Sequence, residues 1–257
     1  MTRVPLKNRT IWITGASSGI GKSMAEKLIQ SGNRLIITAR NENALTAIKK
    51  AAPDQVEVVV ADIADPNSIT HMQERLEAVT DQLDTVILNA GTCEYLDVSN
   101  YDTDLIERVI QVNLLGMSRC IQASLDLLKS SSTNPHIVGI SSAAALTGLP
   151  RAEAYGASKA GVVSFLESLG LDLHRYGIDV SIVYPGFVET PLTDRNDFPM
   201  PYLMDADTAV SLIIDGIEKR KIKITFPRRL IWSLKLMAAL PEKLRFKAGL
   251  SMVRDQG

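Results

Sequence analysis

The chain has 257 residues, of which 28 are Lys or Arg and 29 are Asp or Glu, so its formal net charge is −1. Hydrophobic residues make up 46% and charged residues 22%, which excludes a disordered or collagen-like chain, and two cysteines are too few for a disulfide-stapled small domain. The near-zero charge hides an asymmetry. Residues 219–247 hold ten basic residues and one acidic residue, Glu242, so the remaining 228 residues carry a net −10.

Short apolar runs alternate along the chain with longer segments of helical periodicity. Runs rich in Val and Ile with little apolar–polar alternation are typical of strands buried on both faces of a parallel sheet. The predicted strands are residues 10–14, 34–38, 56–61, 85–89, 136–141, 179–184 and 221–225. The predicted helices lie near residues 20–31, 42–51, 66–80, 102–129, 154–176 and 205–219. This alternation predicts an α/β, Rossmann-like doubly wound fold, a seven-stranded parallel sheet with helices on both faces.

We expect one catalytic domain over residues 1–226 and a helical extension of that domain over residues 227–257. Pro227 and Pro241 bracket one helix there, and its apolar residues cover too much of its surface for a fully solvated helix. Three roles are open for it: covering the substrate pocket or core of its own subunit, packing in an oligomer interface, or peripheral membrane contact through residues 227–247. Nucleic-acid binding is not expected, because the acidic remainder of the surface repels phosphates.

The sequence contains no run of 18 apolar residues, and its first ten residues lack an apolar core of signal-peptide length. We therefore expect a cytoplasmic protein with reduced thiols, in contact with a membrane at most peripherally. The three histidines have neither metal-ligand spacing nor a place in a motif, so we expect them to be structural and predict no metal site.

A glycine-rich turn follows the first predicted strand. Residues Thr14-Gly15-Ala16-Ser17-Ser18-Gly19-Ile20-Gly21 lead directly into a helical pattern, and in that context a glycine motif indicates a dinucleotide site. Gly15 permits a tight turn, Gly19 lets the backbone approach a pyrophosphate, and Gly21 lets the helix pack closely on the strand. The first N–H groups of the helix then face the phosphates.

The residue after the second strand selects the nucleotide. A carboxylate there binds the ribose 2′-OH of NAD, whereas an arginine favours the 2′-phosphate of NADP. This chain has Arg40 at that point, and a charge-assisted bond to phosphate contributes about 1.5–3 kcal/mol. Arg40 therefore predicts NADP(H) in preference to NAD(H).

Tyr155 and Lys159 are four residues apart on a predicted helix, so the phenol and the ammonium point into the same space. A tyrosine with its ordinary pKa of about 10 is a poor acid–base catalyst at neutral pH, and a nearby ammonium lowers that pKa. Bringing it near 7 takes roughly 4 kcal/mol, which we expect Lys159 to share with a cationic oxidised nicotinamide. Ser142 follows an apolar strand, where its hydroxyl is placed to bind a substrate carbonyl.

These motifs together resemble the short-chain dehydrogenase/reductase family in its compact single-domain form. The matching residues run from about residue 6 to residue 226: the turn at 14–21, Asn89-Ala90-Gly91, Asn113, Ser142, Tyr155 with Lys159, and Pro185-Gly186 with Thr190. The resemblance implies that Tyr155 is the general acid in reduction and the base in oxidation. It further implies that Ser142 orients the carbonyl, that Lys159 binds the nicotinamide ribose, and that Asn113 holds a water that relays protons to Lys159.

The resemblance also implies a set of cofactor-binding residues. Asp62 binds the adenine edge, Asn89 lines the cleft, and Val188 and Thr190 hold the carboxamide. The full set is Thr14, Gly15, Ser17, Ser18, Gly19, Ile20, Gly21, Arg40, Asp62, Ile63, Asn89, Ala90, Gly91, Tyr155, Lys159, Pro185, Gly186, Val188 and Thr190.

The expected function is therefore NADP(H)-dependent interconversion of a carbonyl and a secondary alcohol. The segment between Thr190 and Asp205, a lid in this family, suits a largely apolar small molecule because it offers Phe198, Met200, Tyr202, Leu203 and Met204. One alternative is a 3-oxoacyl-thioester reductase whose acidic carrier docks on residues 219–247. A non-catalytic NADP-binding redox sensor is another, against which the intact catalytic residues argue. The family's pairing through the helices near 102–129 and 154–176 implies a homodimer or homotetramer.

Overall fold

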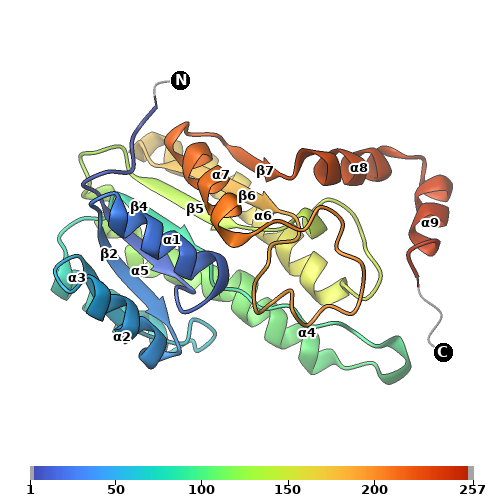
Figure 1. Ribbon diagram of the computed structural model, residues 1–257, viewed down its shortest axis with the longest axis horizontal. Helices are drawn as coiled ribbons and strands as arrows, with labels where there is room; N and C mark the ends of the chain where they lie inside the picture. Colours follow the sequence, from blue (N-terminus) through green and yellow to red (C-terminus); the bar gives the residue numbers. More distant parts are fainter. Residues whose placement is uncertain (1–2, 254–257) are drawn as a thin grey trace.

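A computed structural model describes residues 3–253 of the chain. Its seven strands pair in parallel in the order β3-β2-β1-β4-β5-β6-β7, which confirms the predicted doubly wound sheet (Figure 1). The strand bounds depart from the predicted ones by two residues or fewer. They are β1 Thr10–Thr14, β2 Arg34–Ala39, β3 Val56–Val60, β4 Thr85–Leu88, β5 His136–Ile140, β6 Asp179–Pro185 and β7 Lys223–Phe226.

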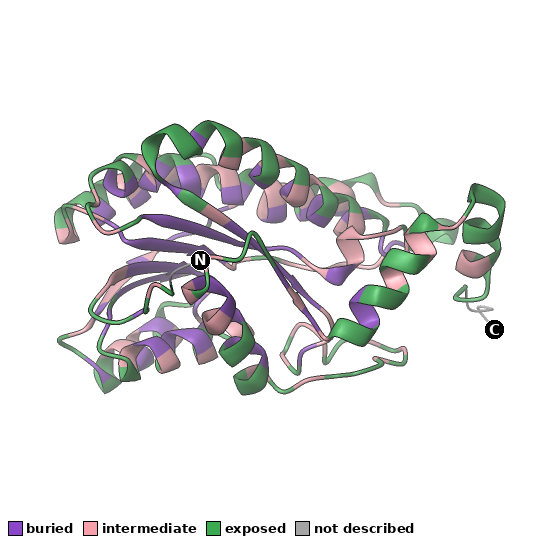
Figure 2. Cartoon of the chain, turned by 90° about the horizontal axis from the view of Figure 1, so that it is seen from above, coloured by how far each residue is buried: buried purple, intermediate pink, exposed green. Residues whose placement is uncertain are grey.

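Helices cover both faces of the sheet, and each layer has its own apolar cluster. On one face lie α1 (Gly19–Gln30), α2 (Glu42–Ala51) and α7 (Ala206–Glu218). On the other lie α3 (Ser68–Val79), α5 (Met117–Lys129) and α6 (Glu153–Leu173). Between these layers the inner strands β1, β2, β4, β5 and β6 are mostly buried (Figure 2), as their apolar runs predicted, while the edge strands β3 and β7 are only partly buried.

The helix predicted near residues 102–129 is divided into three parts. It begins as α4 (Thr103–Ile110), continues through one π-helical segment, η2 (Gln111–Gly116), and resumes as α5. Short 3₁₀ turns stand at η1 (Val98–Asn100), η3 (Ala143–Ala145) and η4 (His174–Tyr176). π-helical turns occur frequently at functional sites, so η2 marks this part of the helix as a candidate position for functional residues.

The strand order reverses between β1 and β4, and this reversal positions the site. β1 and β4 are neighbours in the sheet, but the chain leaves them towards opposite sides of it. Such a pair of strands opens a crevice at its carboxyl ends. Gly15 follows β1 and Asn89 follows β4 at this crevice. The next strands, β5 and β6, end beside it and are followed by Ser142 and Gly186, so motifs far apart in sequence converge on one edge.

The extension forms two helices. The helix predicted between Pro227 and Pro241 is present as α8 (Arg228–Ala239), and its residues Leu230 and Ile231 join the apolar cluster of the α6 face. A further helix that the sequence reasoning missed, α9 (Glu242–Leu250), follows it, and the two project beyond the sheet at one end of the molecule (Figure 1). Across residues 3–253, no helix is both long enough and apolar enough to cross a membrane.

Candidate active site

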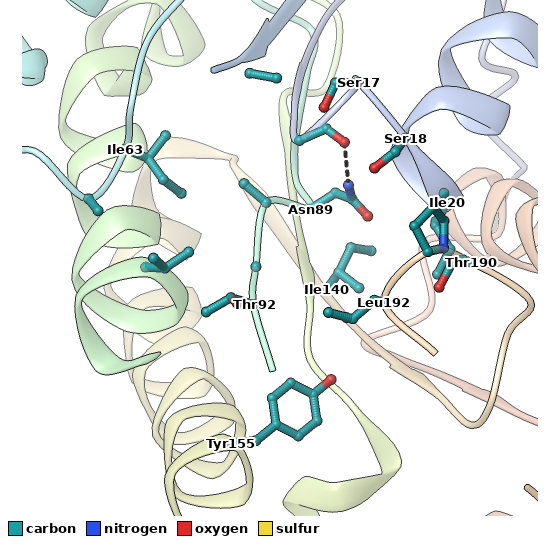
Figure 3. A pocket seen from close by; sticks show the side chains of 18 of the residues that line it. Ser17, Ser18, Ile20, Ile63, Asn89, Thr92, Ile140, Tyr155, Thr190 and Leu192 are labelled. Carbon is teal, nitrogen blue, oxygen red and sulfur yellow. Dashed lines mark hydrogen bonds between the residues drawn. The ribbon is translucent and has the colours of Figure 1, made fainter. Parts of the chain in front are cut away.

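A cleft of about 1060 Å³ runs along the carboxyl edge of the sheet. In Figure 3 it extends from Ser17 and Ser18 at one end to Tyr155 at the other, with Ile63 on one wall and Thr190 on the opposite wall. Most of the predicted site residues line it: Gly15, Ser17, Ser18, Gly19, Ile20, Arg40, Asp62, Ile63, Asn89, Ala90, Gly91, Ser142, Tyr155, Lys159, Pro185, Gly186, Val188 and Thr190. The predicted residues outside this lining are Thr14, Gly21 and Asn113, which contact the backbone behind it.

The glycine-rich turn has no room for a side chain at Gly15 or at Gly21. Gly15 has φ +69°, its N–H donates to the Thr38 carbonyl at 2.7 Å, and a Cβ on it would lie 2.7 Å from Cα of Ala90. A Cβ on Gly21 would lie 2.2 Å from the Gly15 carbonyl oxygen, so this glycine is needed for the turn itself. The turn thereby leaves the start of α1 bare, where the first N–H groups of a helix have no intrahelical partners. A pyrophosphate fits this cradle, which any Cβ would fill.

Two polar side chains fix this turn to the segment after β4. The Thr14 hydroxyl oxygen accepts hydrogen bonds from the N–H groups of Asn89 and Ala90 at 3.1 and 3.2 Å. In return, Nδ2 of Asn89 donates to the carbonyls of Thr14 and Gly15 at 3.2 and 3.1 Å (Figure 3). Thr14 is buried, so its place in the family motif is explained by this bracing and not by contact with a ligand.

A cation and a carboxylate stand side by side at the nucleoside end. Nη1 of Arg40 lies 3.9 Å from Oδ2 of Asp62, and 77% of the Arg40 side chain is exposed. Oδ1 of Asp62 accepts from the Ala64 N–H at 2.9 Å, which holds the carboxylate at the rim of the cleft. Arg40 is therefore held only loosely, by a long ion pair, and its guanidinium borders the cleft where the sequence predicted it.

Lys159 lies at the opposite end and is only 4% exposed. Its Nζ donates to the Ile140 carbonyl at 2.9 Å and lies 5.8 Å from the centroid of the Tyr155 ring. Burial lowers the pKa of Lys159 to about 8, and the Cys93 thiol nearby opposes that shift. Gly91 makes this packing feasible, because a Cβ there would lie 3.3 Å from Nζ.

The chain alone raises the pKa of Tyr155, whereas the lowered pKa was expected with an oxidised nicotinamide bound. Burial raises it to about 12, while a hydrogen bond with the Ser142 side chain lowers it. The reason is geometric: Lys159 shares the face of Tyr155 but directs its ammonium to the Ile140 carbonyl. In the ligand-free chain Tyr155 is thus a protonated acid at neutral pH, and forming its phenolate needs a further positive charge nearby.

Asn113 lies in the π-helical segment and braces the segment after β4. Its Oδ1 accepts from the Thr92 N–H at 2.8 Å, and its Nδ2 donates to the Thr92 carbonyl and to Oγ of Ser158, both at 2.9 Å. Its side chain is fully buried, and the Ser158 hydroxyl in turn donates to the Tyr155 carbonyl at 2.7 Å. Asn113 is therefore linked to the first turn of α6, and its water-holding role stays a prediction.

A second cavity, of about 1720 Å³, adjoins the first and has a mainly apolar lining. The two cavities share Ser142 and Tyr155, together with Pro185, Gly186, Leu192 and Thr193. Phe198 stands in its wall with its ring edge-on to Tyr95 and Phe187, at centroid distances of 5.7 and 5.9 Å. An apolar chamber thus opens directly onto the tyrosine hydroxyl.

The lid is fastened over this chamber by polar contacts. Nη1 of Arg151 lies 3.0 Å from Oδ2 of Asp197, and the Tyr95 hydroxyl donates to Oδ1 of Asn196 at 2.5 Å. Of the five apolar lid residues predicted to suit the substrate, only Phe198 lines the chamber in the described part of the chain. Tyr202 and Leu203 are exposed. The other two are held elsewhere: Met200 Sδ accepts from Nδ2 of Asn196, and Met204 packs on the α1-side cluster.

Sequence reasoning missed several residues of the two cavities. Thr92, Gln111, Val112, Ile140 and Leu192 line the first. Thr92 and Leu192 lie within two residues of predicted ones, so extending each motif along its strand end would have found them. Gln111 and Val112 face the cleft only through the π-helical segment, for which the sequence carries no signal. The second cavity is also bordered by α8 and α9, including Leu234, Met237, Phe246 and Leu250.

Comparison with known proteins gives one consistent family. The short chain dehydrogenase family matches residues 9–198. An uncharacterized oxidoreductase of Myxococcus xanthus is 34% identical over 239 residues, 92% of this chain and 94% of that protein. Among solved structures, a Burkholderia cenocepacia short chain dehydrogenase in complex with NADP superposes with a TM-score of 0.82 at 21% identity, over 98% of this chain and 100% of that one. A Burkholderia phymatum short chain dehydrogenase/reductase in complex with NAD has a TM-score of 0.81 at 22% identity, over 94% and 96% of the two chains.

Proposed function

This chain belongs to the short chain dehydrogenase family and is an oxidoreductase of that family, and we propose that it uses NADP(H) to interconvert a carbonyl and a secondary alcohol on a largely apolar small molecule. One observation carries the proposal. The cleft with the glycine-rich cradle and the apolar chamber meet at Ser142 and Tyr155, so a hydride carrier and a carbonyl would face each other at one hydroxyl pair.

The chain's own residues supply positioning and a proton. When bound, the nicotinamide would supply or accept the hydride. In reduction, the Ser142 hydroxyl donates a hydrogen bond to the substrate oxygen, and the Tyr155 hydroxyl gives it a proton. The Tyr155 phenol carries this proton at neutral pH, and a positive charge beside it would bring its raised pKa closer to neutral and make it a stronger acid. Lys159 would hold the nicotinamide ribose, and its ammonium becomes available for that if the Nζ bond to Ile140 is exchanged.

Support for NADP(H) over NAD(H) comes from Arg40, the exposed cation at the nucleoside end of the cleft. Arg40→Asp replaces a phosphate-binding cation by a ribose-binding carboxylate. We expect the ratio of kcat/KM for NADPH over NADH to fall about tenfold to a hundredfold. Arg75→Asp makes the same change of charge on an exposed position of α3 outside the cleft and should leave the ratio unchanged. An unchanged ratio in Arg40→Asp would remove the assignment.

The direct test is a screen of carbonyl substrates that follows NADPH absorbance. A panel of ketones, quinones and 3-oxoacyl thioesters separates the proposal from its competitors. The thioester reductase has one observation in its favour, the basic residues of α8 and α9 beside the chamber, where an acidic carrier would dock. It predicts activity on carrier-bound thioesters well above that on free ketones. A redox sensor predicts NADPH binding without oxidation by any compound.

We further propose that two or four copies pair through α4, α5 and α6, as the family habit implies. Sedimentation equilibrium measures the assembly directly. A monomer at micromolar concentration would contradict this part of the proposal.

A further inference from the structure

The outer face of α8 carries an apolar stripe between cations. Trp232 and Leu236 are one helical turn apart and are 70% and 67% exposed. Arg228 and Lys235 lie on one side of this stripe and Arg229 on the other, as the 100° spacing of a helix dictates. The opposite face of α8, with Leu234 and Met237, is turned to the chamber, so the exposed stripe is not part of its wall.

The next helix, α9, adds exposed apolar and basic side chains distributed around its circumference. Leu244, Phe246 and Leu250 of α9 are all more than half exposed, and Figure 2 shows most of α9 as exposed. Lys243, Arg245 and Lys247 add three cations to those of α8, against the single acid Glu242. Within residues 3–253, none of the six cations belongs to an ion pair. The two helices thus combine exposed large apolar groups with uncompensated positive charge.

We propose that α8 and α9 bind the surface of an anionic lipid bilayer. A tryptophan and leucines between lysines and arginines are the composition of helices that lie in the headgroup region, with the rings in the interface and the cations on lipid phosphates. The acidic remainder of the chain, at net −10 outside residues 219–247, is repelled by the same surface, which orients the molecule with α8 and α9 towards it. A second copy of this face is a poor partner, because each copy would bring a net +5 from residues 227–247.

The exposed residues of α9 and the segment after it also border the substrate chamber. Phe246, Leu250 and Val253 are exposed and at the same time line the cavity that reaches Ser142 and Tyr155. A compound that leaves the bilayer beside α9 therefore enters the chamber along apolar side chains. Resting on the proposed function, this assigns the substrate class: a carbonyl on a long aliphatic chain that resides in the lipid layer.

Vesicle sedimentation tests the docking without any catalysis. The full chain is mixed at low salt with vesicles of phosphatidylcholine alone or with 30% phosphatidylglycerol (about one lipid in three), and the bound fraction is measured. We expect binding to the anionic vesicles that weakens with added salt. Arg228→Glu with Arg229→Glu should weaken it about 30-fold or more, since each cation contributes about fivefold. Trp232→Ala with Leu236→Ala should weaken it about tenfold or more, because it removes two exposed apolar groups and keeps helix-favouring residues.

Matched control variants separate the effect of this face from the effects of net charge and of exposed apolar side chains elsewhere on the molecule. Lys7→Glu with Lys50→Glu changes the net charge equally at exposed positions away from α8 and should bind as the unaltered chain does. Leu171→Ala with Ile222→Ala removes two other exposed apolar side chains and should also bind normally. No binding to anionic vesicles at low salt overturns the proposal, and so does equal loss in the control variants. A change of oligomeric state in the α8 variants without a change in vesicle binding assigns the face to copy–copy contact and overturns it too.

An activity measurement tests the substrate class. NADPH oxidation is followed with a long-chain ketone held in each kind of vesicle and with a short water-soluble ketone. We expect the α8 variants to lose about tenfold or more in rate on the long-chain ketone in anionic vesicles while keeping their rate on the soluble one. Equal rates for variants and unaltered chain on the long-chain ketone overturn the substrate class. Failure to reduce either ketone contradicts the proposed function and leaves the sedimentation result standing.

Discussion

Lys159→Met tests whether the buried lysine is held against a desolvation penalty. Lys159 is 4% exposed, and burial brings its pKa from 10.5 to about 8. Each pKa unit corresponds to about 1.4 kcal/mol. At pH values where the lysine is protonated in both the folded and the unfolded chain, its burial therefore lowers the free energy of unfolding by about 3 kcal/mol. Methionine has a similar length, no charge and a good fit to apolar surroundings, so the replacement removes this penalty.

The sign of the effect follows from proton counting. Between about pH 8 and 10.5, the folded lysine has lost its proton while the unfolded one keeps it. The unfolded state binds more protons there, so the free energy of unfolding of the unaltered chain rises with pH. Integrated from pH 7 to 9.5, the rise amounts to about 2 kcal/mol, which Lys159→Met lacks. Removing the penalty should therefore raise the free energy of unfolding of Lys159→Met relative to the unaltered chain at pH 7. This advantage should shrink by about 2 kcal/mol between pH 7 and pH 9.5.

Urea unfolding of the cofactor-free proteins at pH 7 and 9.5, followed by circular dichroism, measures this difference. Titrating groups that do not interact with Lys159 are common to both proteins and cancel in the comparison. Lys7→Met removes an exposed lysine and should show no such pH-dependent difference. A stability difference between Lys159→Met and the unaltered chain that stays constant across the two pH values would refute the reasoning.

Two further predictions concern buried groups around the sheet. His136 is buried with Nε2 2.8 Å from Oγ of Ser181, and burial lowers its pKa to about 3. Below pH 6.5 the folded chain therefore binds fewer protons than the unfolded one, so the free energy of unfolding falls as the pH falls. In urea unfolding, His136→Gln should lose about 2 kcal/mol less of this free energy between pH 7 and 5 than the unaltered chain. An equal loss in both proteins would contradict this. Gly21→Ala places a Cβ 2.2 Å from the Gly15 carbonyl oxygen and should cost about 1–3 kcal/mol of stability, with weaker NADPH binding by titration calorimetry, whereas Gly148→Ala meets nothing within 4 Å and should change neither. Unchanged NADPH affinity in Gly21→Ala would show that the turn does not hold the cofactor.

The sheet and the glycine-rich turn were predictable because their signals are local. Apolar runs mark strands buried on both faces, and Gly15 directly follows one such strand, Thr10–Thr14. The carboxyl ends of parallel strands lie on one edge, which is why residues that follow four different strands line one cleft. Asp205 likewise marks the start of α7, where its side chain accepts from the Thr208 N–H at 2.7 Å.

The remaining features depend on contacts that sequence spacing does not contain. The i, i+4 spacing correctly places Tyr155 and Lys159 on one face, yet it is silent about the Ile140 carbonyl that takes the ammonium. Burial therefore raises the pKa of Tyr155 in the chain alone, and the lowering expected from Lys159 and an oxidised nicotinamide stays a prediction for the cofactor-bound protein. The π-helical segment around Asn113 is likewise set by the tertiary hydrogen bonds to Thr92, and not by propensity.

The sequence also located the helix of the C-terminal extension without showing what each of its faces contacts. The prolines at 227 and 241 and the apolar pattern located α8, and covering the pocket was one of the three roles left open. Leu234 and Met237 border the chamber, which favours that role for one face of the helix. Trp232 and Leu236 point outwards, so one face of α8 borders the chamber while the opposite face is exposed.

The central claim, that the cofactor cleft and the substrate chamber meet at an acid–base tyrosine, is tested most directly by Tyr155→Phe. The variant keeps the ring and removes only the hydroxyl, so NADPH binding by fluorescence titration should stay within about twofold of the unaltered chain. Turnover of a ketone that the unaltered chain reduces should fall by about 10²–10⁴-fold, the usual contribution of a positioned general acid. Turnover near that of the unaltered chain would contradict the account.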